Sequence, residues 1–363
     1  MINEISLRKI KKILIIKLRK IGDVLLTTPT IKAFRVQFPQ AHIAALVNSG
    51  TEEVLTDNPL LDEVIVFDRN WKSLPFLTKI KRQCRFVLDI RKKDFDLVLD
   101  LTGGDRPAII SFLSGAKYRV VHDPGKSGFF GKRWLYNHLV KSMDSQRKHM
   151  VEYNLDAVRY LGIAPKDKKV DIFVPPSIQV KVDSLLSSKV DIAKDLLVQV
   201  HPTSDWLFKC WRDEYVAEII DYFSAQYGAK IIITSSPAQK ELDKIENILR
   251  YVRTKDIICL AGKTTLKELA AVSRRCKLFF GVDTAAMHIA AATGTTSIVL
   301  FGPSGEFHWG PWGEDHIVIT SDPACRPCGK DGCNGSKYSK CLDIITPERV
   351  RAAIDEKIET EYF

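Results

Sequence analysis

The sequence predicts an α/β protein made of two doubly wound domains, each a parallel sheet covered by helices on both faces. The 363 residues are too many for one ordinary domain and suit two of similar size. Short runs rich in Ile, Leu and Val alternate with helix-length amphipathic segments, which is typical of strands buried on both faces. The alternation restarts after a stretch containing Pro175 and Pro176, so we expect domains of residues 1–175 and 176–363.

In the first domain, four apolar runs indicate strands and two longer amphipathic segments indicate helices. The strands are expected at 12–18, 43–47, 63–67 and 96–101, and the helices at 24–38 and 76–92. A polar helix is expected near Val180, just after the boundary.

In the second domain, strands and helices alternate more regularly. The strands are expected at 195–200, 229–234, 256–260, 277–281 and 296–301, and the helices at 213–227, 237–251, 266–274 and 284–292. Open parallel sheets bind ligands beyond the carboxyl ends of their strands, so the informative residues should directly follow strands.

Composition and charge narrow the function classes. No apolar run reaches the roughly 18 to 20 residues of a membrane span, and residues 1–12 lack the pattern of a secretory signal, so the cytoplasm is the expected location. The net charge of +10 favours an anionic partner, such as nucleic acid, anionic lipid or a phosphorylated glycan. Lys and Arg are spread along the chain without a nucleic-acid-binding motif, which disfavours the first of these.

The eight cysteines fall into two groups. Four are scattered and expected to be reduced core residues: Cys84, Cys210, Cys259 and Cys276. The other four cluster near the C-terminus: Cys325, Cys328, Cys333 and Cys341. This second group begins with a C-x-x-C pair and could hold a structural zinc ion, although its spacing is irregular. Unbound packing thiols, or a disulfide outside a reducing cytoplasm, are the alternatives.

The first polar constellation follows the first predicted strand, in residues 17–24 with the sequence KLRKIGDV. Asp23 stands after a Gly turn and three basic residues, whose charge would keep its carboxylate ionised and ready to act as a general base. The simpler interpretation is a helix N-cap, a position that Asp favours. The loop lacks the full glycine fingerprint of dinucleotide sites, which disfavours a nicotinamide cofactor.

The second constellation follows the first strand of the second domain, in residues 201–211 with the sequence HPTSDWLFKCW. The hydroxyls of Thr203 and Ser204 could donate hydrogen bonds to a diphosphate, and the Lys209 ammonium could neutralise its charge. The alternative is an ordinary loop with a surface lysine. The glycines of a P-loop are absent.

The third constellation follows the strand at 277–281. Asp283 can cap the next helix, whose first N–H groups would form an anion site, and Ala285 is small enough for a pyrophosphate to approach. Thr284 and His288 are four residues apart and share a helix face, although a lone helical His is often structural. Gly262 and Lys263, after another strand, would line the same cleft beside an adenine or ribose.

Together these segments resemble glycosyltransferase family 9, the lipopolysaccharide heptosyltransferases. The residues that carry the resemblance are KLRKIGDVLLTTPTIKAFR, VQVHPTSDWLFKCW, LAGKTTLKELAAVSRRCKLFFGVDTAAMHIAAATGTTSIVLFGPSG and WGPWG. The end of the long block and the cysteine segment are most similar to the heptosyltransferase III branch of the family.

The resemblance implies a GT-B fold of two Rossmann-like domains facing each other across a cleft, the first binding the acceptor and the second the donor. It implies inverting transfer of heptose from ADP-L-glycero-D-manno-heptose to the lipopolysaccharide inner core, with no metal or other cofactor required. Asp23 matches the proposed base. The donor-binding residues that match are Thr203, Ser204, Lys209, Asp283, Thr284, Ala285 and His288. A family Glu that contacts the nucleotide has no clear match among Ser235, Ser236, Pro237 and Glu241.

The acceptor implied by the family is lipid-linked and anionic, so we expect peripheral contact with the inner face of an inner membrane. Residues 125–134 mix aromatic and basic side chains, which suits a membrane contact or a loop over a phosphorylated acceptor, unless the aromatics pack inward. Arg106, Lys117 and Arg119 could add positive charge. A transferase or epimerase using a UDP-sugar, and an inactive relative that only binds nucleotide, are the alternatives.

Overall fold

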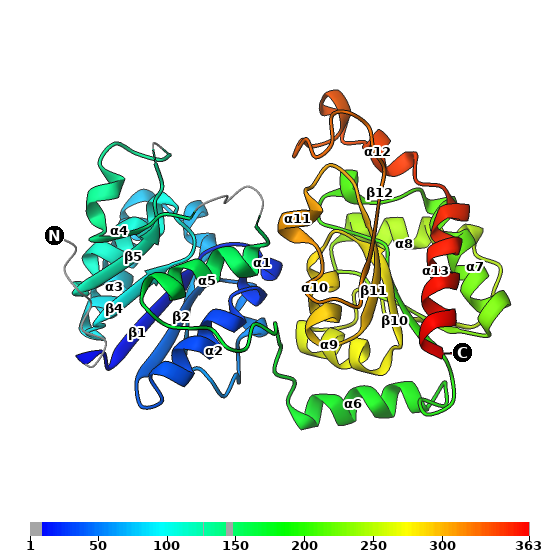
Figure 1. The fold of residues 1–363 in the computed structure, drawn as a ribbon, viewed down its shortest axis with the longest axis horizontal. Helices are drawn as coiled ribbons and strands as arrows, with labels where there is room; N and C mark the ends of the chain where they lie inside the picture. Colours follow the sequence, from blue (N-terminus) through cyan, green and yellow to red (C-terminus); the bar gives the residue numbers. More distant parts are fainter. Residues whose placement is uncertain (1–8, 126, 143–147, 363) are drawn as a thin grey trace. The chain divides into compact units, whose positions relative to one another are not determined.

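The structure is a computed structural model that describes residues 9–125, 127–142 and 148–362 (Figure 1). The chain divides into one compact unit of residues 1–173 and a second of residues 174–363. The sequence placed the boundary after residue 175.

The first unit is built on a six-stranded parallel sheet of strand order β3-β2-β1-β4-β5-β6. The strands are β1 (Lys12–Lys17), β2 (His42–Asn48), β3 (Glu63–Phe67), β4 (Leu97–Asp100), β5 (Tyr118–His122) and β6 (His138–Val140). The α-helices are α1 (Ile21–Leu25), α2 (Thr28–Gln37), α3 (Phe76–Lys92), α4 (Asp105–Leu113) and α5 (Met150–Tyr160). Short 3₁₀ turns occur at η2 (Glu52–Val54), η3 (Arg69–Ser73) and η4 (Lys132–Leu135).

The single helix predicted at 24–38 is wrong, because the chain forms two helices there, α1 and α2. Pro29 has no amide proton, and its ring would clash with the carbonyl of Leu25 four residues earlier, where α1 ends. The Thr28 hydroxyl donates to that carbonyl instead, at 3.0 Å, and α2 begins with a proline in its first turn. The break gives the Asp23 segment a short helix of its own.

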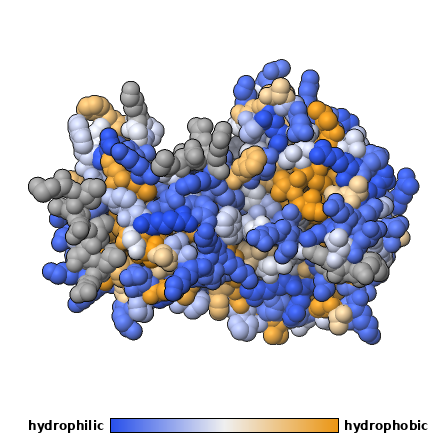
Figure 2. Space-filling model, in the orientation of Figure 1, coloured by the Kyte–Doolittle hydropathy of each residue, from blue (hydrophilic) through white to orange (hydrophobic). Residues whose placement is uncertain are grey.

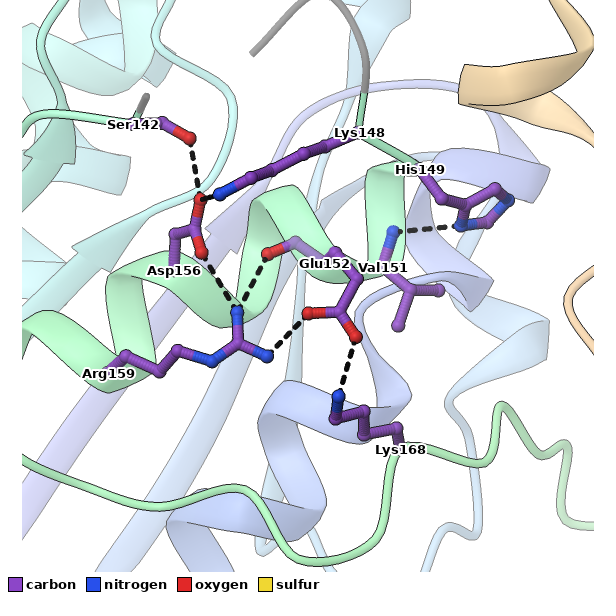
Figure 3. Close-up of polar contacts among 8 residues, drawn as sticks. All are labelled: Ser142, Lys148, His149, Val151, Glu152, Asp156, Arg159 and Lys168. Carbon is purple, nitrogen blue, oxygen red and sulfur yellow. Dashed lines mark hydrogen bonds and ion pairs between the residues drawn. The ribbon is translucent and has the colours of Figure 1, made fainter. Parts of the chain in front are cut away.

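Helix α5 is fixed to neighbouring segments by a network of ion pairs (Figure 3). Asp156 accepts hydrogen bonds from Ser142 at 2.6 Å, Lys148 at 2.8 Å and Arg159 at 2.8 Å. Burial would raise the pKa of the Asp156 carboxyl, but these donors hold it below its usual value. Glu152, one turn earlier, accepts from Arg159 and pairs with Lys168. The network therefore ties α5 to the chain on both sides of it.

The second unit repeats the plan with the strand order β12-β11-β10-β7-β8-β9, again all parallel. The strands are β7 (Leu197–His201), β8 (Lys230–Ile233), β9 (Ile257–Cys259), β10 (Leu278–Val282), β11 (Thr296–Phe301) and β12 (Ile317–Thr320). The α-helices are α6 (Pro176–Ser187), α7 (Asp213–Tyr227), α8 (Gln239–Tyr251), α9 (Leu266–Arg275), α10 (Ala285–Ala292), α11 (Glu306–Trp309), α12 (Lys340–Asp343) and α13 (Pro347–Tyr362). The 3₁₀ turns are η6 (Leu207–Lys209) and η7 (Cys333–Gly335).

The doubly wound α/β fold predicted for each half is confirmed. In both sheets the direction of strand addition reverses once, between β1 and β4 in the first unit and between β7 and β10 in the second. Such a switch point leaves a crevice beyond the carboxyl ends of the two strands, where open α/β sheets bind ligands. A ligand site is therefore expected in the loops after these four strands.

No helix in the described ranges combines the length and apolar character needed to cross a membrane.

Candidate active site

In the first unit, Asp23 lies just beyond β1, at the switch point. Helix α1 begins at Ile21 with Lys20 as its N-cap, so Asp23 is the third residue of the helix and the alternative of an N-cap is wrong. Its side chain belongs to the first helical turn and is partly buried. A carboxylate there is favoured by the positive end of the helix and stays accessible to a ligand.

The same strand end carries the buried ammonium of Lys17, the last residue of β1. Its Nζ donates to the carbonyl of Leu101 at 3.0 Å and to Oδ1 of Asn154 at 3.3 Å. Burial lowers the pKa of Lys17 to about 8, against the opposing effect of the Asp23 charge. The buried charge of Lys17 is therefore close enough to interact electrostatically with Asp23, the candidate base.

The loop after β4 closes the other side of this switch point. The buried carboxyl of Asp100 accepts from the Tyr136 hydroxyl at 2.5 Å and from the amides of Thr102 and Gly103. Burial raises the pKa of Asp100, although these donors and Lys17 act in the opposite direction. The Leu18 amide donates to the Thr102 hydroxyl at 2.8 Å, which joins the two loops.

In the second unit, Lys209 and Asp283 form an ion pair with Nζ and Oδ2 2.6 Å apart. Lys209 lies in η6, beyond β7, and Asp283 directly follows β10, so the pair occupies the switch point of the second sheet. The N-cap of α10 is Thr284, and its side chain makes no capping bond. The prediction that Asp283 caps this helix is therefore wrong: its carboxylate neutralises Lys209 instead.

The hydroxyls predicted to bind phosphate are engaged in different ways. Thr203 is buried, and its Oγ1 donates to Oε2 of Glu241 at 2.6 Å. A threonine hydroxyl carries one proton, so Thr203 offers a ligand only lone pairs in this arrangement, and the predicted hydrogen bond to a diphosphate would require that proton to turn away from Glu241. Ser204 Oγ accepts from the Trp206 amide at 3.3 Å and keeps its proton for another partner.

Glu241 is the residue that sequence analysis missed. Its buried carboxylate also accepts from the Ser236 hydroxyl at 2.5 Å, so it joins the loops after β7 and β8. A signal was present in the sequence: Glu241, Ile245 and Ile248 lie on one face of α8, and all three are buried. A carboxylate on the apolar face of a helix requires hydrogen-bond donors, which here are the hydroxyls of the neighbouring loops.

A second polar layer supports the Thr203 turn. Nδ1 of His201 lies 2.9 Å from the Thr234 hydroxyl, which also accepts from Gln199. Burial lowers the pKa of His201 to about 4, although the Glu241 charge acts against this shift. His201 is consequently neutral near pH 7 and serves to support the turn rather than to carry charge.

The remaining predicted donor residues lie along the same edge of the sheet. Gly262 has a φ of +67°, and a Cβ there would come within 3.0 Å of Leu242 and 3.3 Å of Pro237, so the turn after β9 requires glycine. Lys263 is exposed and donates to the carbonyl of Cys259 at 3.3 Å, so it turns back towards its own strand.

Thr284 and Ala285 are partly buried at the start of α10, and His288 is buried one turn later. Because β10, β7, β8 and β9 are neighbours in that order, their loops form a row. At about 4.8 Å per strand the row spans about 14 Å, which suits a nucleotide better than a single phosphate.

The chain just after the last cysteine of the cluster contacts the residues that follow Lys209. The indole of Trp211 donates to the Ile345 carbonyl at 3.0 Å, and Arg212 pairs with Asp343 on α12. Among the residues that the structure describes, no three or more His, Cys, Asp or Glu side chains are grouped to hold a metal ion. Cys341 is buried and Cys325 exposed, while Cys328 and Cys333 are partly buried, all as free thiols. The geometry thus gives the zinc hypothesis no support.

Cys84 is also exposed, which corrects its assignment to the core.

Comparison with known proteins decides the family. A family model described as glycosyltransferase family 9 (heptosyltransferase) matches residues 84–339. Lipopolysaccharide heptosyltransferase 3 of Escherichia coli is 30% identical over 338 residues, which cover 92% of this chain and 96% of the relative. The chain belongs to glycosyltransferase family 9. The predicted family and enzyme class are therefore confirmed, and the relative agrees with the predicted branch.

Solved structures show that this family 9 glycosyltransferase shares its fold along the whole chain. A glycosyltransferase family 9 protein from Veillonella parvula superposes with a TM-score of 0.81 at 24% identity, covering 97% of this chain and 98% of the other. The E. coli heptosyltransferase WaaC with ADP-2-deoxy-2-fluoro heptose gives a TM-score of 0.72 at 19% identity, covering 95% and 99%. The predicted fold class agrees with both.

Proposed function

We propose that this family 9 glycosyltransferase transfers heptose from ADP-L-glycero-D-manno-heptose to the inner core of lipopolysaccharide, with inversion and without a metal or other cofactor. The observation that carries the proposal is the Lys209–Asp283 pair at the switch point of the second sheet, beside the start of α10. The similarity to E. coli lipopolysaccharide heptosyltransferase 3 supports the acceptor class, and the ligand bound to WaaC supports the donor class.

The donor half of the reaction takes place at the Lys209 side of this pair. A bound diphosphate would attract the Lys209 ammonium away from Asp283 and accept hydrogen bonds from the first N–H groups of α10. Asp283 would then be free to accept hydrogen bonds from hydroxyls of the sugar. Thr203, whose proton is directed to Glu241, would accept from a donor group such as a ribose hydroxyl.

The chemical step is a single displacement at the anomeric carbon. Asp23 removes the proton of the acceptor hydroxyl while its oxygen forms a bond to the anomeric carbon, and the bond from that carbon to the diphosphate oxygen breaks. ADP leaves with the electron pair, and its developing charge is stabilised by Lys209 and by the start of α10. One displacement inverts the configuration of the sugar.

The lipid-linked acceptor places the reaction at a membrane surface, which we propose is the cytoplasmic face of the inner membrane. In the 125–134 loop, Phe130 is 93% exposed and Trp134 is 73% exposed, so the alternative that these aromatics pack inward is wrong for both. Lys126 of this loop lies outside the described residues.

The basic residues named for the acceptor have partners of their own. Arg106 lies over the Phe67 ring at 4.6 Å, Lys117 lies over the Tyr118 ring at 5.1 Å, and Arg119 donates to the carbonyls of Ala116 and Leu135. Contact with the acceptor would require these side chains to leave or share those partners.

The test compares wild-type protein with Asp23→Ala and Asp23→Asn. The activity is transfer from ADP-heptose to a heptose-bearing, truncated core, and ADP binding is measured separately by calorimetry. We expect both variants to lose activity by about 10² to 10⁴-fold, the usual contribution of a general base, with ADP affinity unchanged. Full activity in either variant would require another base. ADP binding without transfer by wild-type protein would point to another sugar or acceptor, and a preference for UDP would point to the UDP-sugar alternative.

A further inference from the structure

Helix α3 presents an unusual surface for a helix packed on a sheet. Its inner face contacts the core through Phe86 and Ile90, and the Phe86 ring lies edge-on to Phe67 at 5.4 Å. Four large apolar side chains next to this inner face, around the helix, are between 41% and 79% exposed: Phe76, Leu77, Ile80 and Leu88. Cys84 is exposed among them.

These exposed residues form one continuous stripe. At 100° per residue, Phe76, Ile80, Cys84, Leu77 and Leu88 fall within an arc of about 120° along more than three turns of the helix. Exposed Arg91 lies in the same arc beyond Leu88, so a cation ends the stripe at its C-terminal side. Exposed apolar residues scattered singly are normal in any protein, and hydrophobic residues reach the surface on both units (Figure 2). A stripe that follows helical periodicity on the solvent side is instead typical of a helix with a second apolar partner.

The elements next to α3 in the first unit also carry exposed apolar side chains. Helix α4 packs against α3, and η4 packs against α4. Both carry further exposed apolar side chains: Ile109, Phe112 and Leu113 on α4, Trp134 on η4, and Phe130 just before it. Phe130 and Trp134 lie edge-to-face, with ring centroids 5.6 Å apart. We call this combined area, from α3 to Trp134, the α3 surface.

Charge identifies the kind of partner. Helix α3 carries six cationic side chains and one carboxylate, Asp89, which lies 3.8 Å from Lys92. The cations are Lys79, Lys81, Arg82, Arg85, Arg91 and Lys92. Lys81, Arg82, Arg85 and Lys92 are exposed and occupy the arc next to the apolar stripe. An apolar stripe beside a cationic one is the pattern of a helix that lies in the interface of an anionic bilayer.

We propose that the α3 surface docks this protein on a membrane rich in anionic lipids, with the apolar stripe of α3 entering the headgroup region and the adjacent cations contacting lipid phosphates. This proposal rests on the proposed function, because an enzyme with a lipid-linked acceptor must reach that acceptor at a bilayer. The test of membrane docking does not depend on catalytic activity. Long Lys and Arg side chains can reach headgroups while their methylene stems lie along the apolar stripe.

The experiment measures sedimentation of the full-length protein with two kinds of vesicle, phosphatidylcholine alone and phosphatidylcholine mixed with phosphatidylglycerol. One variant removes the stripe, as Phe76→Ser, Leu77→Ser and Ile80→Ser combined. A second reverses the charge, as Lys81→Glu, Arg82→Glu and Arg85→Glu combined. The matched controls are Val36→Ser on α2, where Val36 is 73% exposed, and Lys194→Glu in the second unit.

We expect wild-type protein and both controls to bind the anionic vesicles and to bind the neutral ones weakly or not at all. Each basic residue near an anionic surface contributes roughly tenfold or less, so the charge-reversed variant should lose about two orders of magnitude in affinity. The stripe variant should lose a comparable amount, and both should keep full transfer to a delipidated core oligosaccharide, because none of the changed residues belongs to the candidate site.

Three results would overturn the inference: equal binding to both vesicle types, binding by the variants at the wild-type level, or no binding by any form. So would ultracentrifugation showing a wild-type dimer that the stripe variant dissociates, because the stripe would then contact a second copy of the chain. Failure of the proposed function is distinguished by its own readout. Wild-type protein that binds anionic vesicles but transfers no heptose would refute the function and leave the docking surface standing.

Discussion

Three buried charged residues lie close to the two switch points and contribute charge to the candidate site. Lys17 and Asp100 are buried at the ends of β1 and β4, and Glu241 is buried next to the loop after β7. None of them follows from motif spacing, because each is defined by what surrounds it. Their burial makes them the residues whose removal tests the site most directly.

Lys17 gives a prediction for the pH dependence of stability. Because its pKa falls from 10.5 to about 8 on folding, burying the charged form costs stability in full below pH 8, and this cost disappears as the pH rises towards 10.5. We expect wild-type protein to gain about 2 kcal/mol relative to Lys17→Met between pH 8 and pH 9.5, at 1.36 kcal/mol per pH unit. Urea unfolding of both proteins across this range measures the difference. A constant difference would mean that Lys17 keeps an ordinary pKa in the folded state.

Glu241 gives a prediction for donor affinity. Glu241→Ala leaves the hydroxyls of Thr203 and Ser236 without their acceptor, so the turn loses its orientation. A hydrogen bond to a charged group contributes about 1.5 kcal/mol, so we expect KM for the nucleotide sugar to rise about tenfold with kcat little changed. Glu241→Gln, which keeps an acceptor oxygen, should have a smaller effect. Glu246→Ala, on the exposed side of α8, is the control, and an equal effect there would indicate a general loss of structure.

At the scale of elements, local pattern predicted most of the secondary structure. Two strands and two helices, β3, β11, α3 and α7, have the predicted bounds, because their apolar periodicity is strong and continuous. The elements without a prediction include the short strands β5, β6 and β12 and the helices α4, α5 and α13. β6 and β12 lie at the edges of their sheets and β5 lies next to an edge, and pairing with a neighbouring strand, rather than a long apolar run, decides where these short strands form.

The pairing of β10 with β7 gives a prediction for stability. A Cβ on Gly281 would lie 2.6 Å from the carbonyl oxygen of His201 and 2.8 Å from the Phe279 ring. We expect Gly281→Ala to cost about 1 to 3 kcal/mol, as overpacking usually does, and to lower the urea midpoint accordingly. The control is Gly305→Ala, whose added Cβ would have no neighbour closer than 3.7 Å. Equal midpoints for the two variants would contradict the close approach of these strands.

At the scale of the whole molecule, the proposed chemistry needs no divalent ion, because Lys209 and the N–H groups of α10 supply the positive charge that departing ADP requires. We expect transfer to persist at an unchanged rate after dialysis against a chelator. The assay is heptose transfer with and without the chelator, with the metal content of the protein measured in parallel. Loss of activity that one divalent metal restores would refute a metal-independent reaction. The placement of acceptor and donor domains across a cleft stays a prediction.

The sequence by itself determined the α/β class, the two-domain plan, and the residue types at the strand ends. Hydrophobic periodicity is a local property of the chain, and the rule that ligands bind beyond the ends of parallel strands is general, so both can be applied without a structure. Only the tertiary structure decided which of those residues meet. Lys209 and Asp283 are 74 positions apart, and Thr203 and Glu241 are 38 apart, so their contacts exist only because β10 and β8 both lie beside β7. The sequence likewise predicted helix α3, but not which of its apolar residues are exposed. Their exposure depends on which face of the helix packs against the sheet, and only the folded structure decides that contact.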